Sequence, residues 1–339
     1  MKVLMIFDLP VPPAFDIDYR AKIESDDPDW QTEHDVFLAL QKLGHEVRFL
    51  GLNHELDPLI QEVRISKPDV VFNLCESFEN DRVYEPHIVA LLELLQVPYT
   101  GAPSSALALC KDKGLTKKVL SYHRIRNPEF LISQGAHPLR TFPRMRYPAI
   151  VKPLGLEASE GIDQNSIVTN AKEAKAQVAR LHHRFETDVI IEQYIQGREI
   201  YFGVLGNGRM VILPPRELFF DRIKNEEEKF ATYQLKWDEK YRKRWGIRND
   251  DAEAIDAKAL RLVHTQIRKI YRLFGLQGYA RFDFRLTENN QWYFLEANPN
   301  PALAADDDFA SAARKAGFSY DELIDHILRS AVNPKSQRK

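Results

Sequence analysis

Strand-like and helix-like segments alternate through roughly the first hundred residues, and this alternation limits the possible folds more than any other feature. The apolar run "KVLMIF" predicts a strand, "DVFLALQKLG" predicts an amphipathic helix, and "PDVVFNLCE" predicts a buried strand. A helix through "HIVALLELLQ" and a short strand at "VPYTG" complete the series. Strands that alternate with helices form parallel sheets with crossover helices, so we expect an α/β unit here.

A segment rich in Pro and Asp, "DLPVPPAFDIDYRAKIESDDPDW" at 8–30, interrupts this series directly after the first strand. In parallel α/β sheets, ligands bind at the loops that follow the carboxyl ends of strands. The segment is therefore either a ligand-binding loop or a surface insertion.

Composition sets the class of protein. The chain has 339 residues, of which 44% are hydrophobic and 28% charged, as in soluble globular proteins of about two or three packed units. A net charge of −2 gives no electrostatic reason to expect nucleic acid or an anionic membrane as partner. We find no spanning-length apolar run, no signal-peptide core, and no disulfide or zinc pattern in the two cysteines. We therefore expect a cytoplasmic protein.

Two strand-like runs near the carboxyl end, "RFDFRL" and "WYFLEAN", carry polar residues among core residues. The pair Asn289-Asn290 between them predicts a two-residue hairpin turn, because Asn tolerates positive φ. Pairing about that turn places Asp283 opposite Glu296 and Arg281 opposite Asn298. Since side chains alternate along a strand, all four lie on one face.

Carboxylates directly opposed across a strand pair repel each other, and a divalent cation between them removes the conflict. Asp, Glu and Asn offer only oxygen ligands, which suits Mg²⁺ or Mn²⁺. A hairpin face that points its charges into water would have the same sequence, so the pattern alone leaves both interpretations open.

The stretch "VKPLGLEASEG" places Lys152 ahead of a loop of small residues that includes Ser159 and Gly161. Backbone N–H groups of such a loop can approach phosphates, and a lysine adds positive charge. No GK[ST] follows, so this is not a Walker P-loop, and an ordinary connection between strands has similar composition.

Two further segments carry modest signals. In "VIIEQYIQGREI", Glu192 and Glu199 stand at the two ends of a strand connection that could hold an adenine edge and ribose hydroxyls, or could be a plain connection. In "TYQLKWDEKY", Lys236 lies in a segment dense in charge that could equally be a solvated face.

Taken in order along the chain, these motifs resemble the ATP-grasp superfamily, and within it the D-alanine–D-alanine ligase group. The resemblance covers roughly 69–331 and rests on "VPYTG", "DKGLTKKVL", "VIIEQYI", "YQLKW", "RFDF", "WYFLEANPNP" and "AGFSYDELIDHIL". It implies an α/β (α+β) ATP-grasp fold with a parallel amino-terminal domain at 1–103. Two α+β subdomains at 104–196 and 197–339 would clamp ATP, and a homodimer is compatible with the resemblance.

The resemblance also implies residue roles. Lysines would bind nucleotide phosphates under the small-residue loop, the strand connection would hold adenine and ribose, and an arginine would stabilise charge on the transferred phosphoryl group. The implied ATP-binding residues are Lys113, Lys152, Ser159, Gly161, Glu192, Gln193, Ile195, Glu199 and Lys236; the implied ligands of two Mg²⁺ or Mn²⁺ ions are Asp283, Glu296 and Asn298; the implied catalytic residue is Arg281.

In the reaction that the resemblance implies, a carboxylate attacks the γ-phosphate of ATP to give an acylphosphate and ADP, and an amine then displaces phosphate. The partners would be small-molecule carboxylates and amines. The other classes that we consider are a Mg-ATP-dependent phosphotransferase, an ATP-binding module without ligation, and a protein that kept the fold but not the chemistry. The intact polar hairpin argues against the last of these.

Four places depart from the D-alanine enzymes. The Pro-rich segment replaces a small-residue loop that carries a glutamate, and Leu74-Cys75-Glu76-Ser77 stand in the segment where those enzymes have a His-Gly pair. Glu157 and Ala158 stand near the position of a Gly-Ser pair in the small-residue loop, and Asp307-Asp308 replace a Ser-Leu pair. We therefore expect a ligase that does not make D-alanyl-D-alanine, with Glu76, Asp307 and Asp308 as candidate substrate residues. The aspartates favour a positively charged acceptor, or they simply start the following helix, where acidic residues complement the helix dipole.

Overall fold

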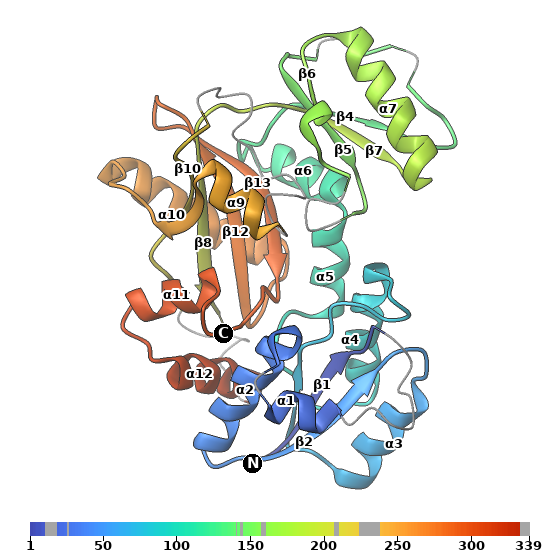
Figure 1. Ribbon diagram of the computed structural model, residues 1–339, viewed down its shortest axis with the longest axis vertical. Helices are drawn as coiled ribbons and strands as arrows, with labels where there is room; N and C mark the ends of the chain where they lie inside the picture. Colours follow the sequence, from blue (N-terminus) through green and yellow to red (C-terminus); the bar gives the residue numbers. More distant parts are fainter. Residues whose placement is uncertain are drawn as a thin grey trace.

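Three separate β-sheets, each covered by helices, form the framework of the part of the chain that the structure describes (Figure 1). The first is parallel and the other two are built from antiparallel pairs, so the predicted combination of an α/β unit with α+β units is confirmed. Each sheet lies within one of the three predicted domains, whose boundaries stay predictions. The computed structural model describes residues 1–10, 19–25, 27–139, 141–142, 145–156, 161–206, 210–223 and 238–332.

The strands of the first sheet are the buried apolar runs expected from the sequence. The predicted strand at "VPYTG" was wrong in extent: it is reduced to a single bridge between Val71 and Tyr99, because Pro98 has no N–H to extend the ladder. In spatial order β2-β1-β3, the elements are β1 (Lys2–Asp8), β2 (Glu46–Leu52) and β3 (Val70–Asn73), with α1 (Tyr19–Glu24), η1 (Pro28–Trp30), α2 (Gln31–Lys42), α3 (Asp57–Ser66), η2 (Arg82–Tyr84) and α4 (Glu85–Leu94).

The next segment forms two helices, α5 (Ser104–Lys111) and α6 (Lys113–Tyr122). Asp112 separates them, because its ψ of 89° is not helical and its carboxylate accepts the N–H of Leu115 at 2.8 Å. The second sheet, in the order β4-β7-β5-β6, follows with β4 (Phe130–Ser133), β5 (Ala149–Pro153), η3 (Gln164–Ser166), β6 (Ile167–Val168), α7 (Ala171–Phe185) and β7 (Val189–Gln193).

The third sheet contains the polar hairpin, and two features of it were not predicted. The charged stretch "IRNDD" forms an edge strand, and the helix before the hairpin begins after Asp256, whose carboxylate caps it. In the order β11-β10-β8-β12-β13, with β9 beside β8, the elements are β8 (Arg198–Leu205), β9 (Val211–Ile212), β10 (Arg216–Phe220), α9 (Glu239–Trp245), β11 (Ile247–Asp251), α10 (Ala257–Leu273), β12 (Tyr279–Leu286), β13 (Trp292–Pro299), α11 (Asp308–Lys315) and α12 (Tyr320–Val332).

The hairpin of β12 and β13 has the pairing that the sequence predicts at its polar end. Asp283 lies opposite Glu296, and Arg281 lies opposite Asn298. All four side chains line one cavity, which is described below. The predicted register is therefore confirmed where the polar residues stand.

The predicted turn was wrong, and a bulge restores the register. Leu286 pairs with Trp292, which leaves a longer loop in which Asn290 alone has a positive φ of 57°. The pairing shifts by one residue between Asp283 and the next position of β12, and Leu295 is the extra residue on β13. The longer loop and the bulge shift the strand pairing by one residue in opposite directions, so the predicted pairing holds at the polar end.

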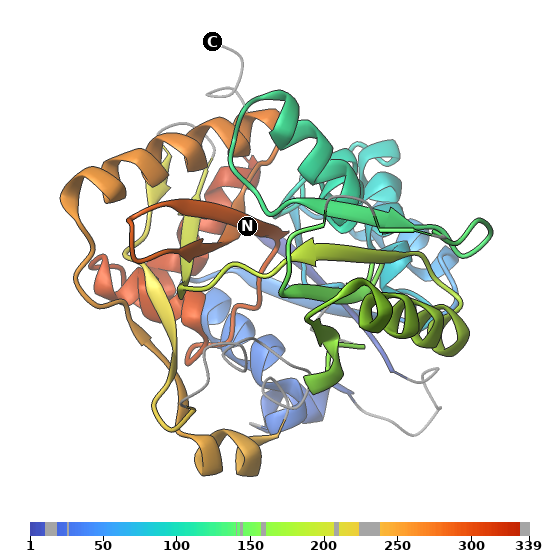
Figure 2. The same cartoon turned by 90° about the horizontal axis from the view of Figure 1, so that it is seen from above.

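Packing ties the sheets together. The carboxyl-terminal α12 packs against α2 beside the first sheet, so the two ends of the described chain meet there (Figure 1). Helices α5 and α10 share one hydrophobic core with the third sheet. Figures 1 and 2 both place the second sheet beside the third. Among the described residues, no helix is both long and apolar enough to cross a membrane.

We predict that Gly197→Ala destabilises the protein by about 2–4 kcal/mol. Gly197 joins the second and third sheets with φ of +144°, and a Cβ there would overlap the carbonyl oxygen of Leu286. Gly275→Ala is the matched control, because Gly275 also has positive φ (+65°) but has open space around it, so its cost should be about 1 kcal/mol. Equal losses in urea-unfolding measurements would contradict the close approach.

Candidate active site

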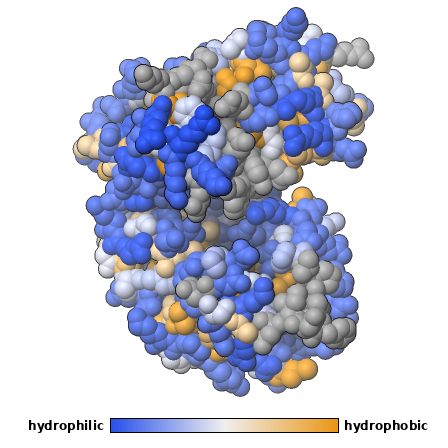
Figure 3. Space-filling view, in the orientation of Figure 1, coloured by the Kyte–Doolittle hydropathy of each residue, from blue (hydrophilic) through white to orange (hydrophobic). Residues whose placement is uncertain are grey.

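A cavity of about 800 Å³ lies between the three sheets. The loop after β3 contributes Glu76, α6 contributes Lys113, the second sheet contributes Lys152, and the third contributes Arg281. In Figure 3 the surface is hollowed between the upper and lower parts of the molecule, and mostly hydrophilic residues surround the hollow. Residues far apart in the sequence therefore meet around one space.

Most of the residues that the sequence singles out line this cavity, and their roles stay predictions. Gly161 is not among the described lining residues; it lies beside Pro153 and Phe185, while Ile162 reaches the cavity. Ser159 and Lys236 fall outside the described residues. The predicted residues that line the cavity are Glu76, Lys113, Lys152, Glu192, Gln193, Ile195, Glu199, Arg281, Asp283, Glu296, Asn298, Asp307 and Asp308.

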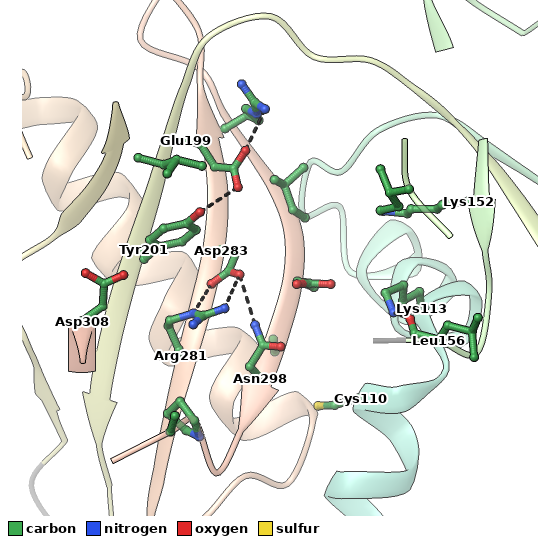
Figure 4. Close-up of a pocket in the computed structure, with 18 of the residues that line it drawn as sticks. Cys110, Lys113, Lys152, Leu156, Glu199, Tyr201, Arg281, Asp283, Asn298 and Asp308 are labelled. Carbon is green, nitrogen blue, oxygen red and sulfur yellow. Dashed lines mark hydrogen bonds and ion pairs between the residues drawn. The ribbon is translucent and has the colours of Figure 1, made fainter. Parts of the chain in front are cut away.

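On the polar hairpin, the side chain of Arg281 binds the carboxylate of Asp283, which the sequence predicts as a ligand of a metal ion (Figure 4). The Nε and Nη2 atoms of Arg281 donate to the two oxygens of Asp283 at 2.8 and 2.9 Å, and Asn298 donates to the same carboxylate at 3.1 Å. The guanidinium also lies 5.0 Å from the ring centroid of Tyr201. Although burial opposes it, the charge of Asp283 raises the pKa of Arg281. Arg281 therefore offsets part of the repulsion between Asp283 and Glu296.

The donor set on this face fits a hard divalent cation. Asp283, Glu296 and Asn298 present carboxylate and amide oxygens from paired positions of one hairpin. Within the described part of the chain, no three His, Cys, Asp or Glu side chains form a ready-made metal cluster. Mg²⁺ is commonly held by one or two carboxylates together with substrate phosphates, so a partial protein site is what such an ion needs.

Across the cavity, lysines surround a buried glutamate. Glu192 is 2% exposed; its Oε2 lies 3.1 Å from Nζ of Lys152, and its Oε1 lies 3.4 Å from Nζ of Lys117. Although burial opposes it, the two lysines lower the pKa of Glu192, so its carboxylate stays charged. Lys113 donates to the carbonyl oxygen of Leu156 at 2.7 Å, ahead of the small-residue loop. This wall of the cavity carries a surplus of positive charge.

Glu199 lies near the start of β8, and each of its two carboxylate oxygens accepts a hydrogen bond. Its Oε2 accepts from Arg285 at 2.7 Å, and its Oε1 accepts from the hydroxyl of Tyr201 at 2.8 Å (Figure 4). Arg285 also donates to the carbonyl oxygen of Gly197 at 2.7 Å, which holds the connection between the two sheets. A ligand hydroxyl at Glu199 would share a carboxylate whose orientation is already fixed.

The aspartates before α11 differ from one another. Asp308 is bonded to Arg216 at 3.2 Å and to Asn249. Asp307 occupies the N-cap position of α11 and Asp308 lies in its first turn, so these aspartates do start the helix, although the side chain of Asp307 makes no capping hydrogen bond. Burial, together with Asp306 and Asp308, raises the pKa of Asp307 to about 6. The surroundings of Asp307 therefore disfavour the charged form of its carboxylate.

Acidic side chains also gather beside the first sheet, where Glu76 reaches the cavity. The carboxylate of Asp8 accepts from the N–H of Glu76 at 2.8 Å and from the hydroxyl of Ser77 at 2.6 Å. Burial beside Asp8 and Glu76 raises the pKa of Glu33 to about 7. Glu76 itself pairs with Arg82 at 3.0 Å. The acidic side chains that line the cavity here are therefore paired with cations, as Lys111 with Glu85 at 2.7 Å also shows.

Sequence reasoning missed several site residues. Lys117 lies one helical turn after a predicted phosphate-binding lysine, so helical spacing is a signal for it. Tyr201 and Arg285 each follow a predicted site residue by two positions on a strand, which places them on the same face. Arg216 has no local signal, because its partner Asp308 is 92 residues away.

The fold and the site define an ATP-grasp ligase: two sheets face each other across one cavity, with lysines on one wall and opposed carboxylates on the other. The family model described as "D-ala D-ala ligase C-terminus" matches residues 109–329. The chain belongs to the D-alanine–D-alanine ligase family. The family and enzyme class expected from the motifs are thereby confirmed.

Individual relatives agree with this assignment. The chain is 34% identical to a D-alanine–D-alanine ligase of Bordetella petrii over 244 residues, which are 71% of this chain and 70% of that protein. It is 28% identical to an uncharacterized protein of Sinorhizobium fredii over 306 residues, 89% of this chain and 87% of that one. The crystal structure of the D-alanine–D-alanine ligase from Bacillus anthracis complexed with ATP shares the fold, with a TM-score of 0.74 over 100% of both chains at 20% identity.

We predict that Asp283→Ala lowers the free energy of unfolding of the unliganded protein by about 2–3 kcal/mol, because it leaves the guanidinium of Arg281 without its bidentate partner. Glu288→Ala, at an exposed position of the same hairpin, is the control and should change it by less than about 0.5 kcal/mol. Chemical denaturation measures both. Unchanged stability in Asp283→Ala would mean that the arginine pair contributes nothing.

Proposed function

We propose that the protein is an ATP-dependent carboxylate–amine ligase that forms an amide bond through an acylphosphate, releases ADP and phosphate, and does not make D-alanyl-D-alanine. The observation that carries the proposal is the division of one cavity into a lysine wall and a carboxylate hairpin in a chain of this family. Such a division suits transfer of a phosphoryl group, whose developing negative charge must be offset on several sides.

The lysine wall supports nucleotide binding. Lys113 and Lys152 reach the cavity and would contact the phosphates of ATP. The Oε1 atom of Glu192 accepts no hydrogen bond from the described residues, although Lys117 lies at 3.4 Å. A buried acceptor of this kind favours a ligand with an N–H donor, such as the amino group of adenine. Glu199, held by Arg285 and Tyr201, would take the ribose hydroxyls.

The hairpin would hold the metal. Asp283, Glu296 and Asn298 supply oxygen ligands for Mg²⁺ or Mn²⁺, and we propose two ions, completed by phosphate oxygens. A divalent cation bound there would neutralise charge on the phosphates. Arg281 would stabilise the transferred phosphoryl group, and for this it must give up at least one of its hydrogen bonds to Asp283.

The reaction would proceed in two displacements. An oxygen of the donor carboxylate attacks the γ-phosphorus, the bond to the bridging oxygen breaks, and ADP leaves. The amine nitrogen then attacks the acyl carbon, loses a proton, and inorganic phosphate departs. In this scheme the cationic groups of both walls offset charge in the first step, while residues at the first sheet and before α11 select the two substrates.

The substrate ends support a product other than D-alanyl-D-alanine. Glu76-Ser77 stand in the segment where the D-alanine enzymes carry a His-Gly pair, and Asp307-Asp308 stand where they carry Ser-Leu. Asp308 is already paired with Arg216, whereas the pKa of Asp307 is raised to about 6 by burial and its acidic neighbours. A positively charged acceptor would relieve that repulsion, so we propose Asp307 as the residue that selects a cationic amine.

We predict that turnover converts ATP to ADP and phosphate in equal amounts, because the donor attacks the γ-phosphorus. Ion-exchange chromatography of the spent nucleotide, with a phosphate assay, tests this on a matrix of amino acids, amines and peptides. AMP and pyrophosphate as the main products would refute the acylphosphate mechanism.

We predict that Asp307→Asn raises KM for a cationic acceptor roughly ten- to hundredfold and leaves a neutral acceptor within about threefold, because a charge-assisted contact is lost. Asp308→Asn is the matched comparison: it breaks the pair with Arg216 and should lower the melting temperature without changing this selectivity. Steady-state kinetics on both variants make the test, and a preference of the wild type for neutral or acidic acceptors would end the hypothesis.

The raised pKa of Asp307 also predicts a dependence of stability on pH. Because the pKa of Asp307 is raised to about 6 in the folded protein, above the ordinary value of 3.8, Asp307 opposes folding increasingly as pH rises between these values. Asp307→Asn should therefore melt at a higher temperature than wild type near pH 7.5 and at about the same temperature near pH 4. A difference that is equal at both pH values would contradict this assignment.

A further inference from the structure

We infer that Lys117 is a positioning residue that holds the carboxylate end of the hairpin in register with the nucleotide-binding wall without contacting substrate. The inference rests on the proposed binding of ATP and a divalent cation. Lys117 lies within the segment "DKGLTKKVL", but the sequence predicted no role for it in the site.

Lys117 bridges two sheets from a fully buried position. It lies on α6 and is 0% exposed. Its Nζ donates to the carbonyl oxygen of Leu295 on the third sheet at 3.1 Å and lies 3.4 Å from Oε1 of Glu192 on the second sheet. One ammonium group therefore joins the two walls of the cavity.

The contact on the third sheet falls on the bulge. Leu295 is the extra residue of β13, and a bulged residue loses its place in the hydrogen-bonding ladder. The carbonyl oxygen of Leu295 is partly buried, and Lys117 supplies a hydrogen-bond donor for it at 3.1 Å. The next residue is Glu296, a proposed metal ligand, so the position of its backbone depends on how the bulge is held.

Lys117 differs from the other two lysines of this wall in its access to the cavity. Lys113, one turn earlier on α6, and Lys152 both line the cavity, whereas Lys117 is not among the described lining residues. Burial lowers the pKa of Lys117 against the attraction of Glu192. An ammonium so deeply buried costs several kcal/mol unless it is paired, and its two partners belong to opposite walls. This geometry fits a tie between walls better than a ligand contact.

The test separates positioning from simple stabilisation. A lysine that only stabilises the fold should, when removed, lower the melting temperature and leave ligand binding by the folded protein unchanged. A lysine that positions Glu296 should change the gain in nucleotide affinity that Mg²⁺ provides. A lysine that contacts phosphate should weaken ATP binding with or without Mg²⁺.

We propose to measure ATP affinity by titration calorimetry, with Mg²⁺ and with EDTA, for wild type, Lys117→Met, Lys117→Gln and Lys118→Met. Lys118 is the adjacent, exposed lysine of the same helix and controls for loss of charge. We expect Lys117→Met to weaken metal-free ATP binding by less than about threefold and to reduce the gain from Mg²⁺ by at least about tenfold, while Lys118→Met matches wild type. Lys117→Gln, which keeps a hydrogen-bond donor for Leu295, should retain part of the gain.

A gain from Mg²⁺ in Lys117→Met equal to that of wild type would overturn the inference, and so would an equal loss of affinity with and without Mg²⁺. If Lys117→Met yields no folded protein, Lys117→Gln is judged by the same ratio. Failure of the wild type to bind ATP with Mg²⁺ would overturn the proposed function and this inference together. Normal wild-type binding with an unchanged variant would overturn this inference alone.

Discussion

Two carboxylates held face to face, Asp283 and Glu296, are the constraint on which the rest of the site depends. The backbone ladder of β12 and β13 fixes their positions, so they cannot relax apart without breaking strand pairing. Nearby positive charge is therefore needed to offset the repulsion between the two carboxylates. Arg281 supplies it from the same strand as Asp283. The pKa of Lys152 is raised although burial opposes it, by the charge of Glu192 beside it and that of Glu296 on the hairpin.

Under the proposed function, this arrangement would make catalysis depend on the relative placement of the sheets. The cations on the second sheet and on α6 would act on the hairpin only while both walls keep their spacing. Buried ion pairs contribute little net stability, because desolvation cancels most of the attraction. Their more important effect here is geometric: Arg285 on Glu199 and Lys117 on Leu295 each join a strand of one sheet to a neighbouring segment.

Local patterns predicted the parts of this site whose partners are close in sequence or follow a strand period. The alternation in β12 and β13 placed Asp283, Glu296 and Asn298 on one face, and it did so although the turn was wrong, because the bulge at Leu295 moved the register back. Patterns could not reveal the break at Asp112 from helical spacing alone, nor the pairing of Arg216 with Asp308. Such contacts depend on how distant elements pack, which no short window of sequence encodes.

Charge repulsion also bears on the proposed binding of the amine acceptor near Asp307. Two like charges 4 Å apart interact by about 4 kcal/mol at an effective dielectric constant of 20. An acceptor carboxylate placed beside Asp307 would meet that repulsion at a group whose own pKa is already raised to about 6. Asp308 would not add the same penalty, since Arg216 balances it. An amine that carries positive charge near Asp307 would reverse the sign of this effect, so under the proposed function this one side chain would disfavour D-alanine as the acceptor.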